Sequence, residues 1–134
     1  GGWANVARFA AARNGRRDPS DRRRRKEASM IYDHRTYTFR PGTIMKALAF
    51  YKEHGYEAQV RNLGKPFLYA YTDVGDVNSY VHIWAYEDAA DRATKRAAMQ
   101  ADPDWQNYLK MSAENGYLES QVNKILVAAP FFEG

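Results

Sequence analysis

The stretch IYDHRTYTF, from Ile31 to Phe39, decides the fold class, because β-branched and aromatic residues alternate along it with polar ones. This pattern predicts a β-strand with two different faces. The Arg40-Pro41-Gly42 turn ends the strand, and from Ile44 onward apolar residues recur at helical spacing. The regular part of the chain therefore begins with a strand followed by a helix.

The same patterns predict the remaining elements. Strands are predicted over residues 67–74, 79–86 and 121–128, and helices over residues 89–100 and from Pro103 onward. Asp88 and Asp102 precede these helices as N-caps, while Gly55 and Gly64 bend and stop the first helix. The helix over 89–100 is alanine-rich and is expected to lie close to the sheet. The order β-α-β-β-α-β with an extra helix predicts an α+β, ferredoxin-like fold with helices on one face of an antiparallel sheet.

Composition excludes several classes of protein. The 134 residues suffice for one domain, and 45% hydrophobic with 27% charged residues is ordinary for a globular one. The absence of cysteine excludes disulfides, thiolate metal sites and thiol nucleophiles. No apolar run approaches the roughly 20 residues of a membrane span, and no secretory signal is recognisable. We therefore expect a soluble, cytoplasmic protein without a membrane span.

Residues 1–29 differ in charge from the domain that follows, residues 30–134. They hold nine of the 20 Lys and Arg residues but three of the 16 acids, so the domain is slightly acidic although the net charge is +4. Their lack of apolar periodicity predicts a disordered tail, or a remnant upstream of a natural start at Met30. A polyanion-binding arm and a mitochondrial transit peptide are the alternatives. The domain itself gives no reason to expect nucleic acid as a partner.

Strand alternation divides the predicted sheet into two faces. Small aliphatic residues such as Val81 and Ile83 are expected to pack beneath the helices. The opposite face, expected to be free of helices, carries Asp33, Arg35, Tyr37, Tyr69, Tyr71, His82, Trp84 and Tyr86. A face this aromatic is not expected to remain solvated on a monomer. It therefore predicts a homodimer in which two sheets face each other as a barrel.

The same eight residues form the candidate ligand-binding site. Arg35 is suited to holding an anion such as a carboxylate, and His82 to exchanging a proton near neutral pH. The alternative is a structural role, in which Asp33 pairs with Arg35 and His82 is satisfied inside the dimer interface. We expect a mixed outcome, with Arg35 structural through Asp33 and His82 available to a small-molecule ligand.

No sequence pattern establishes a catalytic residue. His34, His54 and His82 lack the paired spacing of a metal site, and neither a phosphate-binding loop nor a nucleophile elbow occurs. No metal or cofactor is predicted, although a single histidine that lines a cavity could serve as an axial ligand of haem. Two hypotheses follow. The first is a homodimeric small-molecule-binding or interaction module, and the second is a small-substrate enzyme such as a cofactor-free oxygenase or a haem-handling protein.

Four segments resemble the NIPSNAP family in sequence and in order. They are IYDHRTYTFRPG from Ile31, YVHIWAYED from Tyr80, ADPDWQNYL from Ala101 and NKIL from Asn123. The resemblance covers about residues 30–132 and implies the dimeric α/β-barrel fold. It implies no catalytic residues, because the family's biochemical function is poorly defined and its eukaryotic members are linked only to mitochondria and vesicle traffic. His34 stands where many members have an aliphatic residue, so a buried, neutral histidine is expected there.

Overall fold

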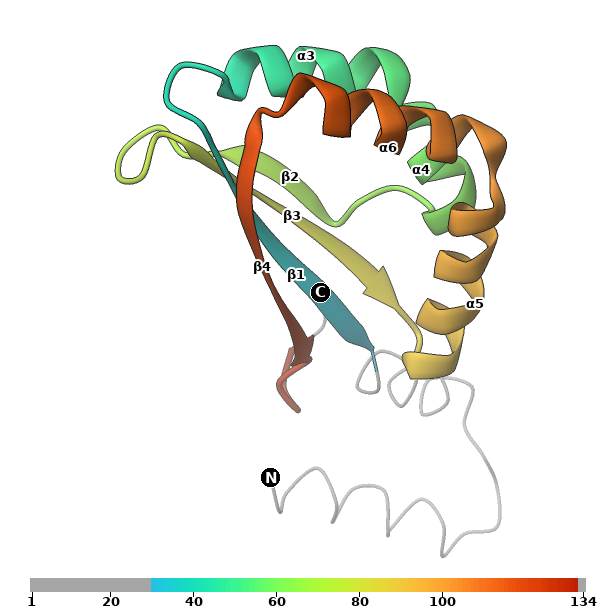
Figure 1. Cartoon of the computed structure of the whole chain (residues 1–134). Helices are drawn as coiled ribbons and strands as arrows, with labels where there is room; N and C mark the ends of the chain where they lie inside the picture. The colour runs from blue at the N-terminus through green and yellow to red at the C-terminus, as the bar shows by residue number, and fades with distance from the viewer. Residues whose placement is uncertain (1–29, 133–134) are drawn as a thin grey trace, which may run out of the picture.

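The computed structural model describes residues 30–132, and its elements have the predicted types and order (Figure 1). They are β1 (Ile31–Phe39), α3 (Ile44–His54), α4 (Tyr56–Leu63), β2 (Leu68–Tyr71), β3 (Ser79–Tyr86), α5 (Ala89–Ala101), α6 (Pro103–Asn115) and β4 (Leu118–Val127). β2 is shorter than predicted. β4 begins at Leu118 rather than Gln121, because its pairing with β1 continues past an irregularity between Thr38 and Phe39. The predicted tail, residues 1–29, lies outside the described residues.

The starts of the last two helices follow the predicted caps. The Asp88 carboxylate accepts a hydrogen bond from the Asp91 amide at 2.8 Å, and that of Asp102 accepts one from the Asp104 amide at 2.9 Å. Pro103 occupies the first turn, where its missing N–H leaves no hydrogen bond unmade. Local chemistry therefore fixes where α5 and α6 begin.

The four strands form one antiparallel sheet in the order β2-β3-β1-β4, which is that of the ferredoxin-like fold. The four helices within residues 30–132 all lie over the same face of this sheet, as expected (Figure 1). The edge strand β4 is exposed along its whole length. None of the helices within residues 30–132 is long and apolar enough to cross a membrane.

Gly55 separates α3 from α4, at the predicted bend. Its φ of −123° is open to other residues, so the backbone itself does not require glycine. A Cβ at this position would, however, lie 2.9 Å from ring atoms of Tyr108 on α6. The small size of Gly55 therefore allows the Tyr108 ring to pack against the bend.

We expect Gly55→Ala to lower the free energy of unfolding by about 1–3 kcal/mol, because the added methyl group overpacks the site beside Tyr108. Urea denaturation measures this loss. In a Tyr108→Leu background the same substitution should cost less, since the ring that it meets is gone. An equal loss in both backgrounds would contradict the steric explanation.

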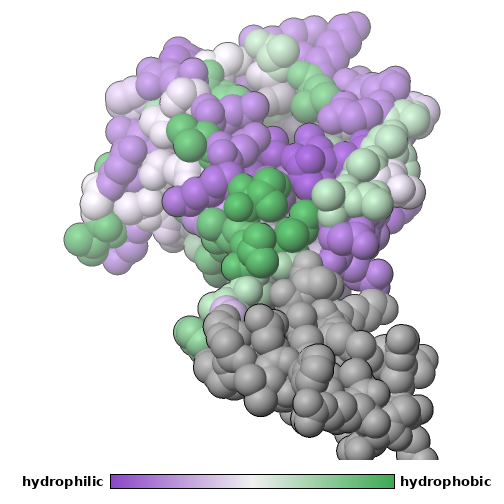
Figure 2. Space-filling model, turned by 90° about the horizontal axis from the view of Figure 1, so that it is seen from below, coloured by the Kyte–Doolittle hydropathy of each residue, from purple (hydrophilic) through white to green (hydrophobic). Residues whose placement is uncertain are grey.

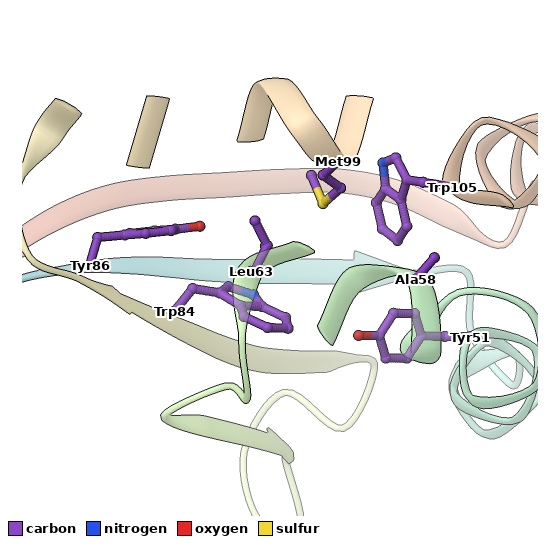
Figure 3. Close-up of a cluster of buried hydrophobic side chains, with 7 residues drawn as sticks. All are labelled: Tyr51, Ala58, Leu63, Trp84, Tyr86, Met99 and Trp105. Carbon is purple, nitrogen blue, oxygen red and sulfur yellow. The ribbon is translucent and has the colours of Figure 1, made fainter. Parts of the chain in front are cut away.

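The helices cover the aromatic face of the sheet, which corrects the prediction. Trp84 and Tyr86 are each 1% exposed and pack with Met99 of α5 in the main hydrophobic cluster (Figure 3). Val81 and Ile83, expected beneath the helices, lie on the other face and are only half-buried. Strand alternation grouped the residues correctly but does not determine which group the helices cover.

The inward side chains of α5 account for this choice of face. On α5, Met99 is buried and Arg92, Lys95 and Arg96 are half-buried, whereas the alanines after the first turn, such as Ala97, are exposed. Long side chains hold a helix away from a sheet, and large aromatic residues fill the intervening layer better than small aliphatic ones. The expected close approach of an alanine surface to the sheet is therefore wrong.

The uncovered face of the sheet combines aliphatic residues with polar ones such as Thr36 and Lys124. Leu68, Val122 and Leu126 belong to this face by register and are 45%, 66% and 39% exposed. Figure 2, which views the molecule from below, shows hydrophobic residues gathered in the middle of the underside and bordered by hydrophilic ones. His34 also belongs to this face and is half-buried there.

Candidate functional site

Seven of the eight predicted site residues come together beneath the helices. Strand register places Asp33 opposite Trp84 and Arg35 opposite His82, so their side chains share one face. We call this group the inner cluster: Asp33, Arg35, Tyr37, Tyr69, His82, Trp84 and Tyr86. Tyr71 is the exception, because it lies at the end of the edge strand β2 and is 53% exposed.

Asp33 is the buried acid of the inner cluster. Its side chain is 0% exposed and accepts hydrogen bonds from Arg35 Nη1 at 3.3 and 3.4 Å. It also accepts one from Arg92 Nε at 3.0 Å, which ties α5 to β1. A buried carboxylate requires such partners, because an unpaired charge is costly to remove from water. The predicted pair of Asp33 and Arg35 is therefore confirmed, and Arg92 is an unpredicted third member.

Arg35 is engaged on several sides. Its Nε donates to the Tyr37 hydroxyl at 3.1 Å. From β4, the Asn123 amide oxygen accepts from Nη1 and Nη2 at 3.1 and 3.3 Å when the amide is turned to satisfy them. Burial by itself lowers the pKa of Arg35, but Tyr37 and Asp33 outweigh that effect and raise the pKa above its ordinary value. Arg35 is therefore a charged, structurally engaged side chain.

His82 is 2% exposed and lies among aromatic rings. The indole N–H of Trp84 donates to its Nδ1 at 2.7 Å. The ring centroids of Tyr37 and Tyr69 lie 4.6 and 4.9 Å from that of His82. Because Nδ1 accepts a hydrogen bond, the proton of the neutral imidazole resides on Nε2. That Nε2 has no hydrogen-bond partner among residues 30–132.

Burial lowers the pKa of His82 to about 3, and repulsion from Arg35, Arg96 and His34 contributes to the shift. The folded protein therefore holds His82 neutral at physiological pH. In that state Nε2 carries a proton that it can donate to an acceptor, but the ring does not exchange a proton at neutral pH. The expectation of proton exchange near neutral pH is corrected accordingly.

Two further buried donors in the adjoining core are unpaired within the described part of the chain, namely the Tyr86 hydroxyl and the Trp105 Nε1–H. Figure 3 shows the Tyr86 ring directed inward, with its hydroxyl towards Leu63 and Met99. Burial raises the pKa of Tyr86, with Arg96 acting against it, so the hydroxyl keeps its proton. A buried donor without an acceptor costs about 1–3 kcal/mol. An incoming acceptor would recover that energy.

The α5 cations are the functional candidates that the sequence analysis missed. Lys95 pairs with Asp91 at 3.2 Å, and Arg92 contacts Asp33 as described above. Arg96 forms no ion pair within residues 30–132, yet it interacts electrostatically with both His82 and Tyr86. The sequence does contain a pattern that identifies these residues, because positions 92, 95, 96 and 99 lie on one face of a helix. The high alanine content of α5 instead favoured the prediction that the alanine side of the helix faces the sheet.

A separate small hollow lies beside the second hydrophobic cluster, which contains Phe39, Ala47 and Tyr80. Its walls include Phe50, Tyr80, Tyr108 and Tyr117, contributed by α3, β3, α6 and the segment before β4. Burial raises the pKa of Tyr108 to about 12, so its hydroxyl is neutral. No local pattern predicts this hollow, because its lining residues come from segments that are distant along the chain.

The inner cluster does not fit the metal centres considered above. In the part of the chain that the structure describes, no three His, Cys, Asp or Glu side chains are grouped to hold a metal ion. His82 is 2% exposed, and the rings of Tyr37, Tyr69 and Tyr80 pack against its imidazole, so the site has no room for a group as large as haem. A porphyrin would have to displace these rings, so the site as built is not suited to haem.

Comparison with known proteins agrees with this fold. The NIPSNAP family model matches residues 32–133. An uncharacterized NIPSNAP-like domain protein from Burkholderia xenovorans is 36% identical, with a TM-score of 0.73 over 80% of this chain and 91% of that chain. A NIPSNAP family protein with unknown function from Agrobacterium tumefaciens is 35% identical, with a TM-score of 0.72 over 79% and 94%. A search of curated proteins found no match.

More distant structures are similar in fold alone. A candidate antibiotic biosynthesis monooxygenase from Nitrosomonas europaea is 15% identical, with a TM-score of 0.51 over 75% of this chain and 91% of that chain. Unrelated functions share such folds, so this likeness does not transfer an activity.

Proposed function

The chain belongs to the NIPSNAP family, and because the Burkholderia and Agrobacterium structures of that family are described as uncharacterized or of unknown function, we propose a function from the residues of this chain. We propose a homodimeric module that binds a small molecule on the helix-covered face of each sheet. The ligand contacts the inner cluster near His82 and Tyr86, and the uncovered faces of the two sheets form the dimer interface.

The unpaired Nε2–H of His82 carries the proposal of a ligand. The ring is buried, its Nδ1 is fixed by Trp84, and its depressed pKa keeps it neutral. A ligand that supplies an acceptor removes the penalty of an unmade buried hydrogen bond. The Tyr86 hydroxyl offers a second donor of the same kind.

The low basicity of His82 favours ligand binding over oxygenase chemistry. An oxygenase without a cofactor needs a base that accepts a proton from its substrate, and such a base works best with a pKa near the operating pH. With a pKa of about 3, His82 is too weakly basic for that role. The carboxylate of Asp33 is already engaged as an acceptor by the guanidinium groups of Arg35 and Arg92. The inner cluster therefore orients a bound molecule rather than transferring its protons.

Nitrogen-15 NMR tests the binding site directly, because the Trp84 indole N–H donates to His82. We expect titration with small acceptor molecules, both benzamide and benzoate, to move the Trp84 indole signal. His82→Phe keeps the aromatic shape but removes the donor, and should abolish the response. An unmoved Trp84 signal with every compound, or an unchanged response in His82→Phe, contradicts the proposed site.

The homodimer is proposed from the aliphatic face and not from the aromatic one. Leu68, Val122 and Leu126 leave a broad apolar surface on the uncovered side of the sheet (Figure 2). Large apolar patches on soluble proteins usually mark an interaction site. A second copy presents the same surface about a two-fold axis, and its chemistry matches without any further partner.

Size exclusion with light scattering should therefore give about twice the 15.4 kDa chain mass. Val122→Asp places a charge on the uncovered face and should shift the protein towards the monomer. Val74→Asp is the matched control, because Val74 lies between β2 and β3 and is already 90% exposed. A wild-type monomer at micromolar concentration, or equal effects of both substitutions, contradicts the proposed interface.

A further inference from the structure

Positive charge is in excess around the inner cluster. Arg35 and Arg92 share the single carboxylate of Asp33, and Arg96 adds a third guanidinium that forms no ion pair within residues 30–132. Lys95 does not alter this balance, because it pairs with Asp91 on its own helix. Partly buried cations without counter-charges attract anions strongly, since solvent screens them poorly.

We propose that the small molecule carries an anionic group, a carboxylate or a phosphate, which binds Arg92 and Arg96 of α5; this inference rests on the proposed function. Arg92 contacts Asp33 through Nε, which leaves its terminal nitrogens as donors. Arg96 follows one helical turn later, on the same side of the helix. Guanidinium groups in such an arrangement grip planar or tetrahedral oxyanions through paired hydrogen bonds.

Arg35 acts as a positioning residue for this anion site. Its donors are engaged by Asp33, Tyr37 and Asn123, so it has little left to offer a ligand. Its positive charge nevertheless offsets the negative charge of Asp33, the carboxylate that Arg92 contacts. An incoming anion therefore meets the α5 arginines without facing an uncompensated carboxylate.

The α5 arginines are accessible because they are partly exposed and because the nearby edge strand β4 is exposed. The side chain of Arg92 is 31% exposed, and the helix-facing residues of β4, such as Ile125, are exposed as well. Arg96 acts electrostatically on His82 and on Tyr86, and it also reaches the Tyr86 hydroxyl oxygen, which leaves the hydroxyl proton free to be donated. The geometry suits a ligand with its anionic group at α5 and an acceptor atom on its less polar, buried part.

Titrations with three matched probes test this inference: benzoate, phenyl phosphate and neutral benzamide, followed by the Trp84 indole signal. We expect at least one anion to bind about tenfold more tightly than benzamide, which is the value of one charge-assisted hydrogen bond. The preferred anion distinguishes a carboxylate ligand from a phosphate. Arg96→Gln should weaken anion binding about tenfold and leave benzamide unaffected. Lys110→Gln, which removes one charge from the exposed surface of α6, should change neither.

Each alternative outcome overturns a defined statement. Equal affinity for anions and benzamide, or equal weakening in Arg96→Gln and Lys110→Gln, overturns the anionic ligand but leaves the binding site in place. Failure of all three probes to move the Trp84 signal overturns both. Arg92→Gln provides a second variant of the same stripe if Arg96→Gln does not fold.

Discussion

Asp33→Asn is expected to lower the free energy of unfolding by about 3–5 kcal/mol, because it leaves the buried Arg35 guanidinium without a counter-charge. The two side chains are 0% and 8% exposed, so solvent does not replace the lost partner. The substitution also weakens the contact between Arg92 of α5 and β1. Asparagine has nearly the size of aspartate, and the loss therefore reports charge rather than packing.

Urea denaturation at neutral pH measures this loss, and Asp104→Asn is the matched control. Asp104 pairs with Arg61 at 3.1 Å, but its side chain is 76% exposed. Exposed ion pairs contribute about 0–1 kcal/mol, so the control should be nearly silent. A loss in Asp33→Asn no larger than in Asp104→Asn would show that the buried pair is not structural and that Arg35 is available to a ligand.

Local signals made the succession of elements predictable. Asp88, Asp102 and Pro103 act within one turn of their own positions, and their effects do not depend on the rest of the fold. Gly64 ends α4 with a φ of 83°, a conformation that glycine adopts without strain. The bounds of β2 and β4 were less accurate, because a strand continues only as far as its neighbour allows.

The membership of the inner cluster was largely predictable, but its surroundings were not. Alternation places Asp33, Arg35 and His82 on one face whatever covers them. Which face is covered depends on how the helices pack against the sheet, and alternation along a single strand does not encode that packing. Tyr71 shows a further limit of strand alternation. It points to the same face as Tyr69, but as the last residue of β2 it is exposed.

The missed partners lie far away along the chain. Arg92 is 59 residues from Asp33, and no local pattern relates the two. Asn123 reaches Arg35 only because β4 returns beside β1. The protonation of His82 was mispredicted for a related reason, because burial dominates its pKa and burial is a property of the assembled layer.

The lowered pKa of His82 is expected to make the free energy of unfolding depend on pH. Its pKa falls from the ordinary 6.5 to about 3 on folding, so between these values the unfolded chain binds a proton that the folded protein does not. The contribution of His82 to stability is therefore fully present above about pH 6.5 and decreases as the pH falls towards 3. The decrease amounts to at most about 1.4 kcal/mol per pH unit.

His82→Asn separates this effect from the carboxylates, because the asparagine oxygen can accept from Trp84 but binds no proton. Urea denaturation from about pH 7.5 to 4.5 should give a difference between wild type and variant that is constant above pH 6.5 and shrinks below it. His54→Asn, which alters a histidine outside the inner cluster with a side chain that is 34% exposed, is the matched control. Arg35, Arg96 and His34 contribute to the low pKa, but burial is its main cause. A difference that stays constant throughout would mean that the folded protein protonates His82, and the neutral donor on which the proposed ligand site depends would then be lost.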